Sequence, residues 1–334
     1  MKYFSRLLLA TVLIITPYYE IFAQTVPTFT VQGAANTLSV LGSITGTPVR
    51  IIAAGTDSTI GMSIVPKSSG FFALAVPDNT NIGGATRGPQ SVDLQLARAA
   101  VSQVASGTWS FVAGLSSTAS GAISIALGQE VNSSGQASVA LNYQTAASGN
   151  NALASGNGTV ASGLSGTAMG TQSADRGRYS ASAFSSGMFS AKGDAQIATQ
   201  ILRISTSAAA SVRLTADAST AGTANVINLP NNGAYFIKTV SFIMRDTVTG
   251  DAAIWYLATP ALIKRAGTAS TTALVSAATL TAGPNSGAGC VAGVAIPTLI
   301  ADTTNGGIIL SVTPATANTN LCRAVAEINT VEIQ

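Results

Sequence analysis

Acidic side chains are the first candidates for chemistry in this sequence, because it contains no histidine. Without histidine, the usual general base and the triads built on it cannot form. A pair of carboxylates could still cleave a glycosidic bond. The acids of the C-terminal half are scattered, however, and most lie beside Gly, Thr or Arg in segments that predict turns: Asp175, Asp194, Asp217, Asp246, Asp251, Asp302, Glu327 and Glu332. We therefore predict turn roles, no catalytic residue and no enzymatic activity.

Metal, cofactor and nucleic-acid sites have equally little support. Asp194 and Asp217 could hold a cation on the axis of a trimer, but nothing in their spacing requires one. No glycine-rich segment is followed by the lysine and helix of a phosphate-binding loop. The net charge is +3, and the densest basic pair beyond the N-terminus is Lys264–Arg265. Because nucleic-acid binding requires a dense basic patch, we expect no nucleic-acid partner, no cofactor and no metal.

The two cysteines, Cys290 and Cys322, leave two interpretations open. A disulfide between them would close a loop of about 32 residues, a stabilisation of about 3–4 kcal/mol in the chain-entropy model. A reduced pair is the alternative.

Composition favours a β-rich, tightly stacked protein. Charged residues are only 9% and aromatic residues 6% of the 334 residues, although 47% are hydrophobic. Ordinary soluble domains contain about 25% charged residues. Disorder normally accompanies high charge and low apolar content, so this composition argues against a disordered chain.

A 14-residue repeat organises residues 105–192. One series of glycines lies 14 residues apart, and a second series follows seven residues later: Gly107, Gly121, Gly135, Gly149 and Gly163, then Gly114, Gly128, Asn142, Gly156 and Gly170. Glycine or asparagine every seven residues supplies corners with positive φ, with about four β-like residues between corners. The repeat therefore predicts a β-solenoid of stacked coils.

Alternation within each coil predicts two different faces. Ile123, Ile125 and Leu127 share one parity, so one face is apolar and the other is small and polar. We expect stacking to bury the apolar face and the small residues to let neighbouring chains approach a common axis. Trp109 is predicted to plug the first coil.

The repeat resembles the head repeat of trimeric autotransporter adhesins, the YadA-like head. The resemblance rests on the Ala-Ser-Gly corner and on the segments Ser124–Gly128 and Ser138–Asn142. It implies a left-handed parallel β-roll packed as a homotrimer. The flanks resemble bacteriophage tail-fibre or virion-appendage proteins, through segments 57–61, 65–67, 83–88, 92–94, 178–196, 301–305 and 325–327. That second resemblance implies a structural fibre on a virion that attaches to a host surface.

The N-terminal third is predicted to join the fibre to a particle. Residues 1–24 have a basic start, an apolar run and a cleavage-like Ala23, so a removed signal peptide and a retained hydrophobic anchor both remain open. Residues 25–91 are expected to form short strands and a linker. Residues 92–104 are expected to form a short helical neck, through an apolar stripe at Leu94, Ala97, Val101 and Val104; a strand starting at Val92 is the alternative.

Residues 193–334 predict a C-terminal antiparallel β-sandwich or jelly-roll tip, because many short strand-like runs alternate with polar turns. Its aromatic residues are expected in the core, with a sugar-binding surface as the alternative: Tyr235, Phe236, Phe242, Trp255 and Tyr256. The whole sequence thus predicts an all-β, homotrimeric virion fibre whose tip contacts a host glycan or protein. A secreted or surface-exposed bacterial adhesin, a capsid-decorating fibre and a glycan-cleaving fibre are the alternatives.

Overall fold

The computed structural model describes residues 37–41, 50–54, 66, 68–276, 278–287, 291–292, 294–315 and 321–334. Within these residues the fold is all-β, with no α-helix and one 3-10 turn, η1 (Ala269–Thr271). The chain forms two compact units, Met1–Val65 and Pro66–Gln334. In the first unit, β1 (Thr37–Leu41) and β2 (Arg50–Ala54) pair antiparallel, in agreement with the short strands expected within residues 25–91. The predicted anchor or signal segment 1–24 lies outside the described residues.

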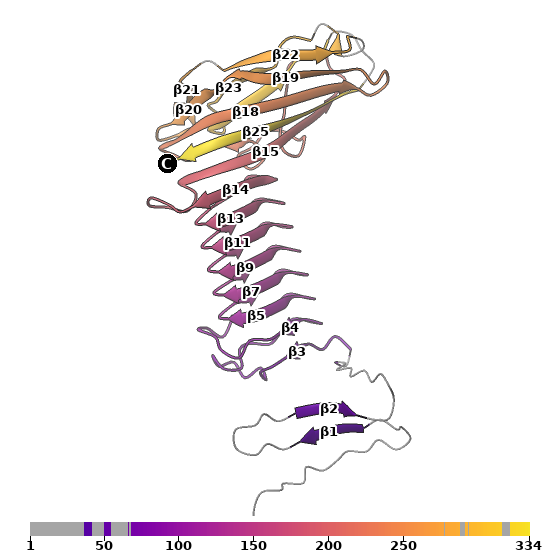
Figure 1. The fold of residues 1–334 in the computed structure, drawn as a ribbon, viewed down its shortest axis with the longest axis vertical. Coiled ribbons are helices and arrows are strands. Elements are labelled where there is room, and N and C mark those ends of the chain that lie inside the picture. Colours follow the sequence, from indigo (N-terminus) through magenta and orange to yellow (C-terminus); the bar gives the residue numbers. More distant parts are fainter. Residues whose placement is uncertain are drawn as a thin grey trace, which may run out of the picture. The chain divides into compact units, whose positions relative to one another are not determined.

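A β-solenoid of about five turns begins the second unit, and Figure 1 shows its coils stacked one on the next. Each coil contributes a five-residue strand to one parallel sheet: β5 (Phe111–Leu115), β7 (Ile125–Gln129), β9 (Val139–Tyr143), β11 (Leu153–Asn157) and β13 (Thr167–Thr171). A two-residue strand follows in a second sheet: β6 (Thr118–Ala119), β8 (Asn132–Ser133), β10 (Ala146–Ala147) and β12 (Val160–Ala161). Cross-strand partners are 14 residues apart, as Ile125 and Val139 are, so the predicted period is confirmed.

The two glycine series have different physical roles. Gly114, Gly128 and Asn142 adopt φ of 130°, 137° and 83°, which confirms the predicted corners of the second series. The first series does not adopt positive φ, so that part of the prediction is wrong. A Cβ on Gly121 would instead lie 2.0 Å from the carbonyl oxygen of Gly135 in the next coil. Glycine is required there because adjacent coils approach too closely for any side chain.

The interior of the coils is filled by small side chains. Val112, Ala126, Ala140, Ala154 and Ala168 are completely buried at one position of successive coils. The larger apolar residues beside them in each strand are only half-buried and point out of the coil. The expectation that stacking buries the large residues and exposes the small ones is therefore wrong. The cause is steric, since an interior this narrow accepts alanine but not leucine.

Trp109 does not plug the first coil, because 59% of its surface is exposed. Trp109 lies at a corner of the coil where the backbone is in the left-handed region although the residue is not glycine. Its indole N–H donates a hydrogen bond to the side-chain oxygen of Gln90. The same corner recurs every 14 residues with φ between 53° and 61°, at Trp109, Ile123, Ala137, Asn151 and Ser165.

The predicted helical neck at residues 92–104 is wrong. Its first residues form β4 (Val92–Asp93), which pairs parallel with β5 on one side and with β3 (Phe72–Ala73) on the other. Buried Asp93 accepts hydrogen bonds from Arg87 Nε at 2.8 Å and Arg98 Nη2 at 3.1 Å. The apolar stripe that predicted the helix is shorter than two heptads and cannot stabilise a helix alone, so these tertiary contacts determine the conformation instead. The expected linker likewise packs on the roll, since Gly88 N donates to Ala105 O.

The main sheet continues from the roll (residues 105–186) into the tip (residues 195–334) without interruption. β14 (Ala181–Ser186) is parallel to β13, and β15 (Ala195–Thr206) turns back antiparallel to it. The sheet then continues through the long strands β25 (Cys322–Ile333) and β18 (Gly233–Asp246) to β20 (Ala261–Arg265) and β21 (Ala273–Leu274). β19 (Ala252–Thr259) also pairs with β18, and β22 (Thr279–Asn285) pairs with β19.

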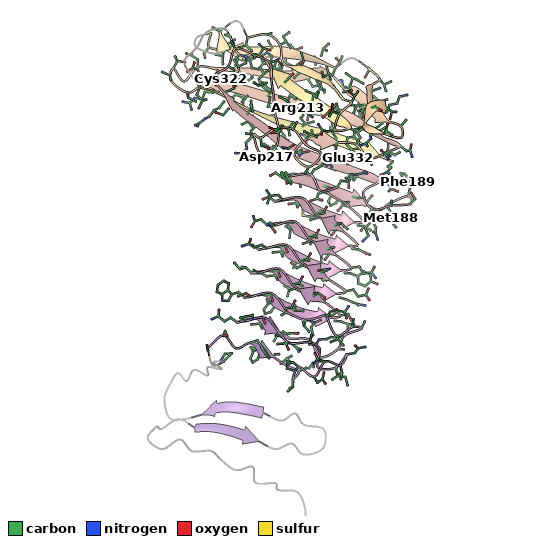
Figure 2. All side chains as sticks on the ribbon, turned by 180° about the vertical axis from the view of Figure 1, so that it is seen from behind. Met188, Phe189, Arg213, Asp217, Cys322 and Glu332 are labelled. Atoms are coloured by element: carbon green, nitrogen blue, oxygen red, sulfur yellow. The ribbon has the colours of Figure 1, made fainter. Side chains whose placement is uncertain are left out.

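A buried ion pair joins the end of the roll to the last strand of the tip. Figure 2 places Glu332 where the tip meets the roll, and its Oε1 lies 2.7 Å from Arg178 Nη1. Both side chains are buried, and the guanidinium of Arg178 lies over the ring of Tyr235. Arg176 Nε lies 3.6 Å from the same carboxylate. Because an unpaired buried charge is costly, this contact favours one arrangement of roll and tip.

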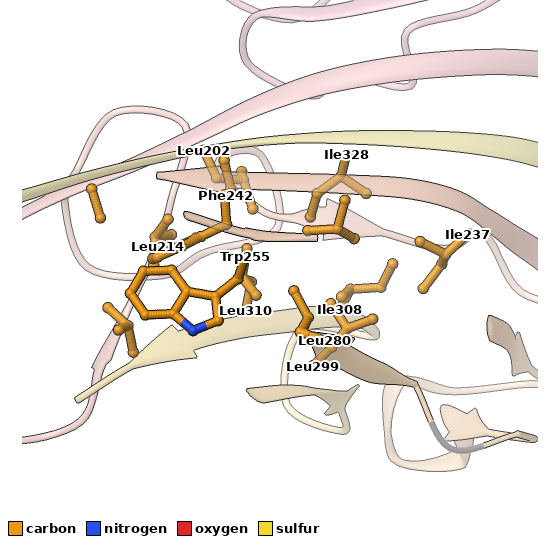
Figure 3. Close-up of a cluster of buried hydrophobic side chains, with 14 of the residues drawn as sticks. Leu202, Leu214, Ile237, Phe242, Trp255, Leu280, Leu299, Ile308, Leu310 and Ile328 are labelled. Atoms are coloured by element: carbon orange, nitrogen blue, oxygen red, sulfur yellow. The ribbon is translucent and has the colours of Figure 1, made fainter. Parts of the chain in front are cut away.

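The core of the tip lies between the main sheet and four strands on one of its faces, β16 (Val212–Arg213), β17 (Ile227–Asn228), β23 (Thr298–Asp302) and β24 (Gly307–Val312). Figure 3 shows the apolar side chains that fill it, among which Phe242 and Trp255 meet edge-to-face with centroids 5.2 Å apart. The core prediction is confirmed for Tyr235, Phe242 and Trp255, whereas Phe236 and Tyr256 are exposed.

A change of Gly121 to alanine tests the close approach of the coils. We expect Gly121→Ala to lower the free energy of unfolding by about 1–3 kcal/mol or more, because the new methyl group meets a backbone carbonyl that cannot move alone. Thermal unfolding followed by circular dichroism measures the change. Gly187→Ala is the control, since a Cβ there has nothing within 4 Å. Equal stability of the two variants would contradict the steric explanation.

Candidate assembly surface

An apolar row crosses the outward face of the main sheet from the roll into the tip. Its members are direct cross-strand partners on successive strands and are apolar except for Ser155: Ala113, Leu127, Leu141, Ser155, Met169, Phe184, Ile197, Val331, Phe236 and Leu262. Phe184 and Ile197 are 51% and 54% exposed where the roll meets the tip, so the row is open to solvent on the single chain. We call this row the assembly surface.

A second row beside it has the same character within the roll. Phe111, Ile125, Val139 and Leu153 are cross-strand partners and are half-buried on the same face. Neither row contains a charged residue. The only charged residue between positions 105 and 174 is Glu130, so the surface has almost no charge to keep it hydrated.

Such a surface can bury itself by contact with another molecule. Exposed apolar patches larger than a few hundred Å² are rare on monomers and indicate an interaction site. Burial would contribute about 25 cal/mol for each Å² removed from water. This surface is therefore suited to association with another molecule.

A loop beside the surface adds two further apolar side chains. Met188 and Phe189 lie between β14 and β15, where Figure 2 labels them, and are 46% and 74% exposed. Phe189 lines a groove of about 390 Å³ together with Phe184, Ile197 and Val331. Asp194 holds the loop, since its carboxylate accepts hydrogen bonds from the backbone N–H groups of Phe189, Ser190 and Ala191 at 2.6–2.9 Å.

A polar cluster interrupts the apolar face within the tip. Asn329 Nδ2 donates to Thr239 Oγ1 at 2.8 Å and to Glu327 Oε1 at 2.9 Å, while the hydroxyl of Thr199 donates to Asn329 Oδ1. Thr199, Asn329 and Thr239 are cross-strand partners, immediately beyond the row that contains Val331. The cluster separates the assembly surface from the distal end of the tip.

The structure does not bring the predicted acidic candidates together in one site. Glu327 and Glu332 lie on strand β25, so the predicted turn role is wrong for these two. Asp194 and Asp217 do not share a site: Asp194 holds its own loop, and Asp217 accepts hydrogen bonds from Ser219 and Asn225. Asp302 is paired with Arg213. Asp246 accepts hydrogen bonds from backbone N–H groups in the turn before Asp251, as predicted. Across the described part of the chain, no group of three or more acids or cysteines could hold a metal ion.

Cys322 is held in a disulfide, which agrees with the disulfide interpretation of the two that the sequence left open; Cys290 lies outside the described residues. No helix in the described segments is long and apolar enough to span a membrane.

Three arginines that the sequence separates widely come together at the distal end of the tip. Arg323 on β25 is the direct partner of Arg245 on β18, and Arg203 on β15 is the partner of the nearby Val325. All three are exposed. No run of basic residues in the sequence marks them, because the pairing of β15, β25 and β18 joins residues up to 120 positions apart.

No protein-family model matches this sequence, and no curated protein is detectably similar to it. The resemblances to the YadA-like head and to virion fibres therefore remain predictions.

The carboxylate of Asp194 makes the stability of the loop beside the assembly surface depend on pH. Burial would raise the pKa of this carboxyl, but the N–H donors of Ala191, Ser190 and Phe189 outweigh burial and lower the pKa from 3.8 to about 2. Because the folded pKa lies below the unfolded one, the stabilisation is present above about pH 4 and is lost as the pH falls through about 2.

We therefore expect Asp194→Asn to lower the denaturant midpoint by the same amount throughout pH 5–8, where no histidine titrates. The difference from the natural chain should shrink between pH 4 and pH 2. Guanidinium titrations at equal protein concentration measure it, with Asp251→Asn as a control for loss of one carboxylate in a turn. A difference that persists unchanged at pH 2 would refute this role of Asp194.

Proposed function

We propose that this chain is a homotrimeric structural fibre or appendage protein of a phage virion that mediates attachment to a host surface. The observation that carries the proposal is the uncharged apolar row that continues from the roll into the tip on one face of the chain. Identical chains carry identical rows, so cyclic association around one axis would cover all of them. The trimer, rather than another cyclic oligomer, follows from the resemblance of the repeats to the YadA-like head.

The parts of the chain take different roles in this proposal. The N-terminal region attaches to other virion proteins, and the left-handed β-roll is a stiff spacer. We interpret the tip as a β-sandwich that is presented to the host. Three tips on one fibre would bind a surface with higher avidity than one tip, because the later contacts are intramolecular.

A secreted or surface-exposed bacterial adhesin is the second candidate, and it differs by cleavage after Ala23. The intact mass of the protein from its native source separates the two. A chain that retains residues 1–23 and co-purifies with particles supports the virion fibre, whether it decorates the capsid or the tail. A chain that begins at Gln24 supports export. Release of sugar from a host envelope would instead favour the glycan-cleaving fibre.

A charge placed in the assembly surface tests the oligomer. We expect the natural chain to sediment with about three times its mass of 33.3 kDa. Leu127→Asp should shift it toward single chains, because each association would bury three unpaired carboxylates near the axis. Sedimentation velocity at several protein concentrations measures the shift.

Asn132→Asp is the matched control for this experiment. It adds the same charge within one coil of Leu127, but Asn132 is exposed on β8 in the other sheet of the roll. We expect this variant to remain associated. A natural chain that sediments as a single chain at all concentrations would refute the proposed oligomer, and so would equal behaviour of the two variants.

A further inference from the structure

The distal end of the outward face carries an unbalanced positive charge. Arg245 and Arg323 lie directly opposite each other on β18 and β25, and Arg203 projects from β15 on the same face. All three are exposed, and none forms an ion pair within the described residues. Arg203 Nε donates to the backbone oxygen of Ala216 at 3.3 Å, which leaves its charge uncompensated. We call these residues the arginine cluster.

The cluster is unfavourable for the isolated chain. Like charges directly opposite each other on neighbouring strands destabilise a sheet. Elsewhere in the tip, Arg213 forms an ion pair with Asp302. Three neighbouring arginines without an ion pair, in a chain with only 9% charged residues, therefore indicate an anionic partner.

A groove adjoins the cluster on the same face. It has a volume of about 410 Å³, within the usual range for ligand sites. Its lining includes Ile243, Ile254, Tyr256 and Val325, together with the acidic residue Glu327. Val325 and Ile243 are cross-strand partners one step from the pair Arg323–Arg245. Tyr256 is 49% exposed. An aromatic ring and aliphatic side chains beside guanidinium groups suit the apolar face of a sugar ring that carries an acidic substituent.

We infer that the arginine cluster and this groove bind a polysaccharide bearing carboxylate, phosphate or sulfate groups. The planar guanidinium groups would bind each anionic group through paired N–H donors, and the groove would hold the adjoining sugar. This inference rests on the proposed attachment function and names the class of ligand for it.

A second copy of the chain does not fit as the anionic partner. The acidic residue on this face is Glu327, whose carboxylate already accepts a hydrogen bond from Asn329. One carboxylate from each copy would not neutralise three arginines. The anion is therefore expected from outside the assembly.

Binding of the full-length protein to immobilised polymers tests the inference. The probes are dextran sulfate, polygalacturonic acid and polyphosphate, which separate the three anionic groups, with neutral dextran as the blank. We expect binding to at least one charged polymer and a loss of about tenfold or more in the triple variant R203A/R245A/R323A. The control K192A/K238A/K264A removes the same three positive charges at exposed positions outside the cluster, and its affinity should remain within about twofold.

The melting temperature and oligomeric state of the triple arginine variant show whether the three arginines bind a ligand or stabilise the protein itself. The triple arginine variant should unfold at the same temperature as the natural chain or higher, because a like-charge contact has been removed, and it should keep its oligomeric state. Dissociation of that variant would overturn the inference, because the arginines would then bind another copy. Equal losses in the arginine and lysine variants, or equal affinity for duplex DNA, would also overturn it.

The proposed oligomer and the proposed anion site can fail independently of each other. If the natural chain sediments as a single chain, the proposed assembly fails, and the arginine variants still report on the anion site. If it sediments as a trimer and the natural chain binds none of the charged polymers, only the assignment of this site fails.

Discussion

The narrow interior of the coil is the constraint on which the rest of this structure depends. Fourteen residues close into a coil with room inside for alanine, serine and an occasional valine, and Gly107 and Gly121 approach too closely to carry a Cβ. Leucine and isoleucine therefore have no place inside and lie on the outer face. A roll of this kind creates an external apolar surface as a consequence of its own packing, so the proposed association would have the same physical cause as the coil geometry.

The period of the repeat, its corners at Gly114 and Gly128 and the all-β class could be predicted because each depends on local residue types. Which face of a strand lies inside could not, because alternation separates two faces without saying which one the coil encloses. The usual rule that large apolar residues are buried gave the wrong answer for Leu127. The helix predicted at 92–104 failed for a different reason, since buried Asp93 pairs with Arg87 and Arg98 only in the folded chain.

The candidate sites depend on the register between paired strands, which is even harder to predict from the sequence than which face of a strand is buried. The apolar row continues into the tip only because Phe184 is opposite Ile197, and Ile197 opposite Val331. The arginine cluster exists only because β25, at the end of the chain, inserts between β15 and β18. Each of these residues is unremarkable in its own segment, and pairings between distant strands cannot be deduced from local patterns.

The distribution of charge connects these features. A stack of coils must be capped at both ends, because each terminal coil has a neighbour on one side only. The chain places buried ion pairs at both ends, Asp93 with two arginines before the first coil and Glu332 with Arg178 after the last. Between them Glu130 is the only charge up to residue 174. This chain has few charged residues, and the buried arginines that the structure describes are in ion pairs. The exposed arginines of the arginine cluster face one another and form no ion pair within the described residues, so we assign them to ligand binding.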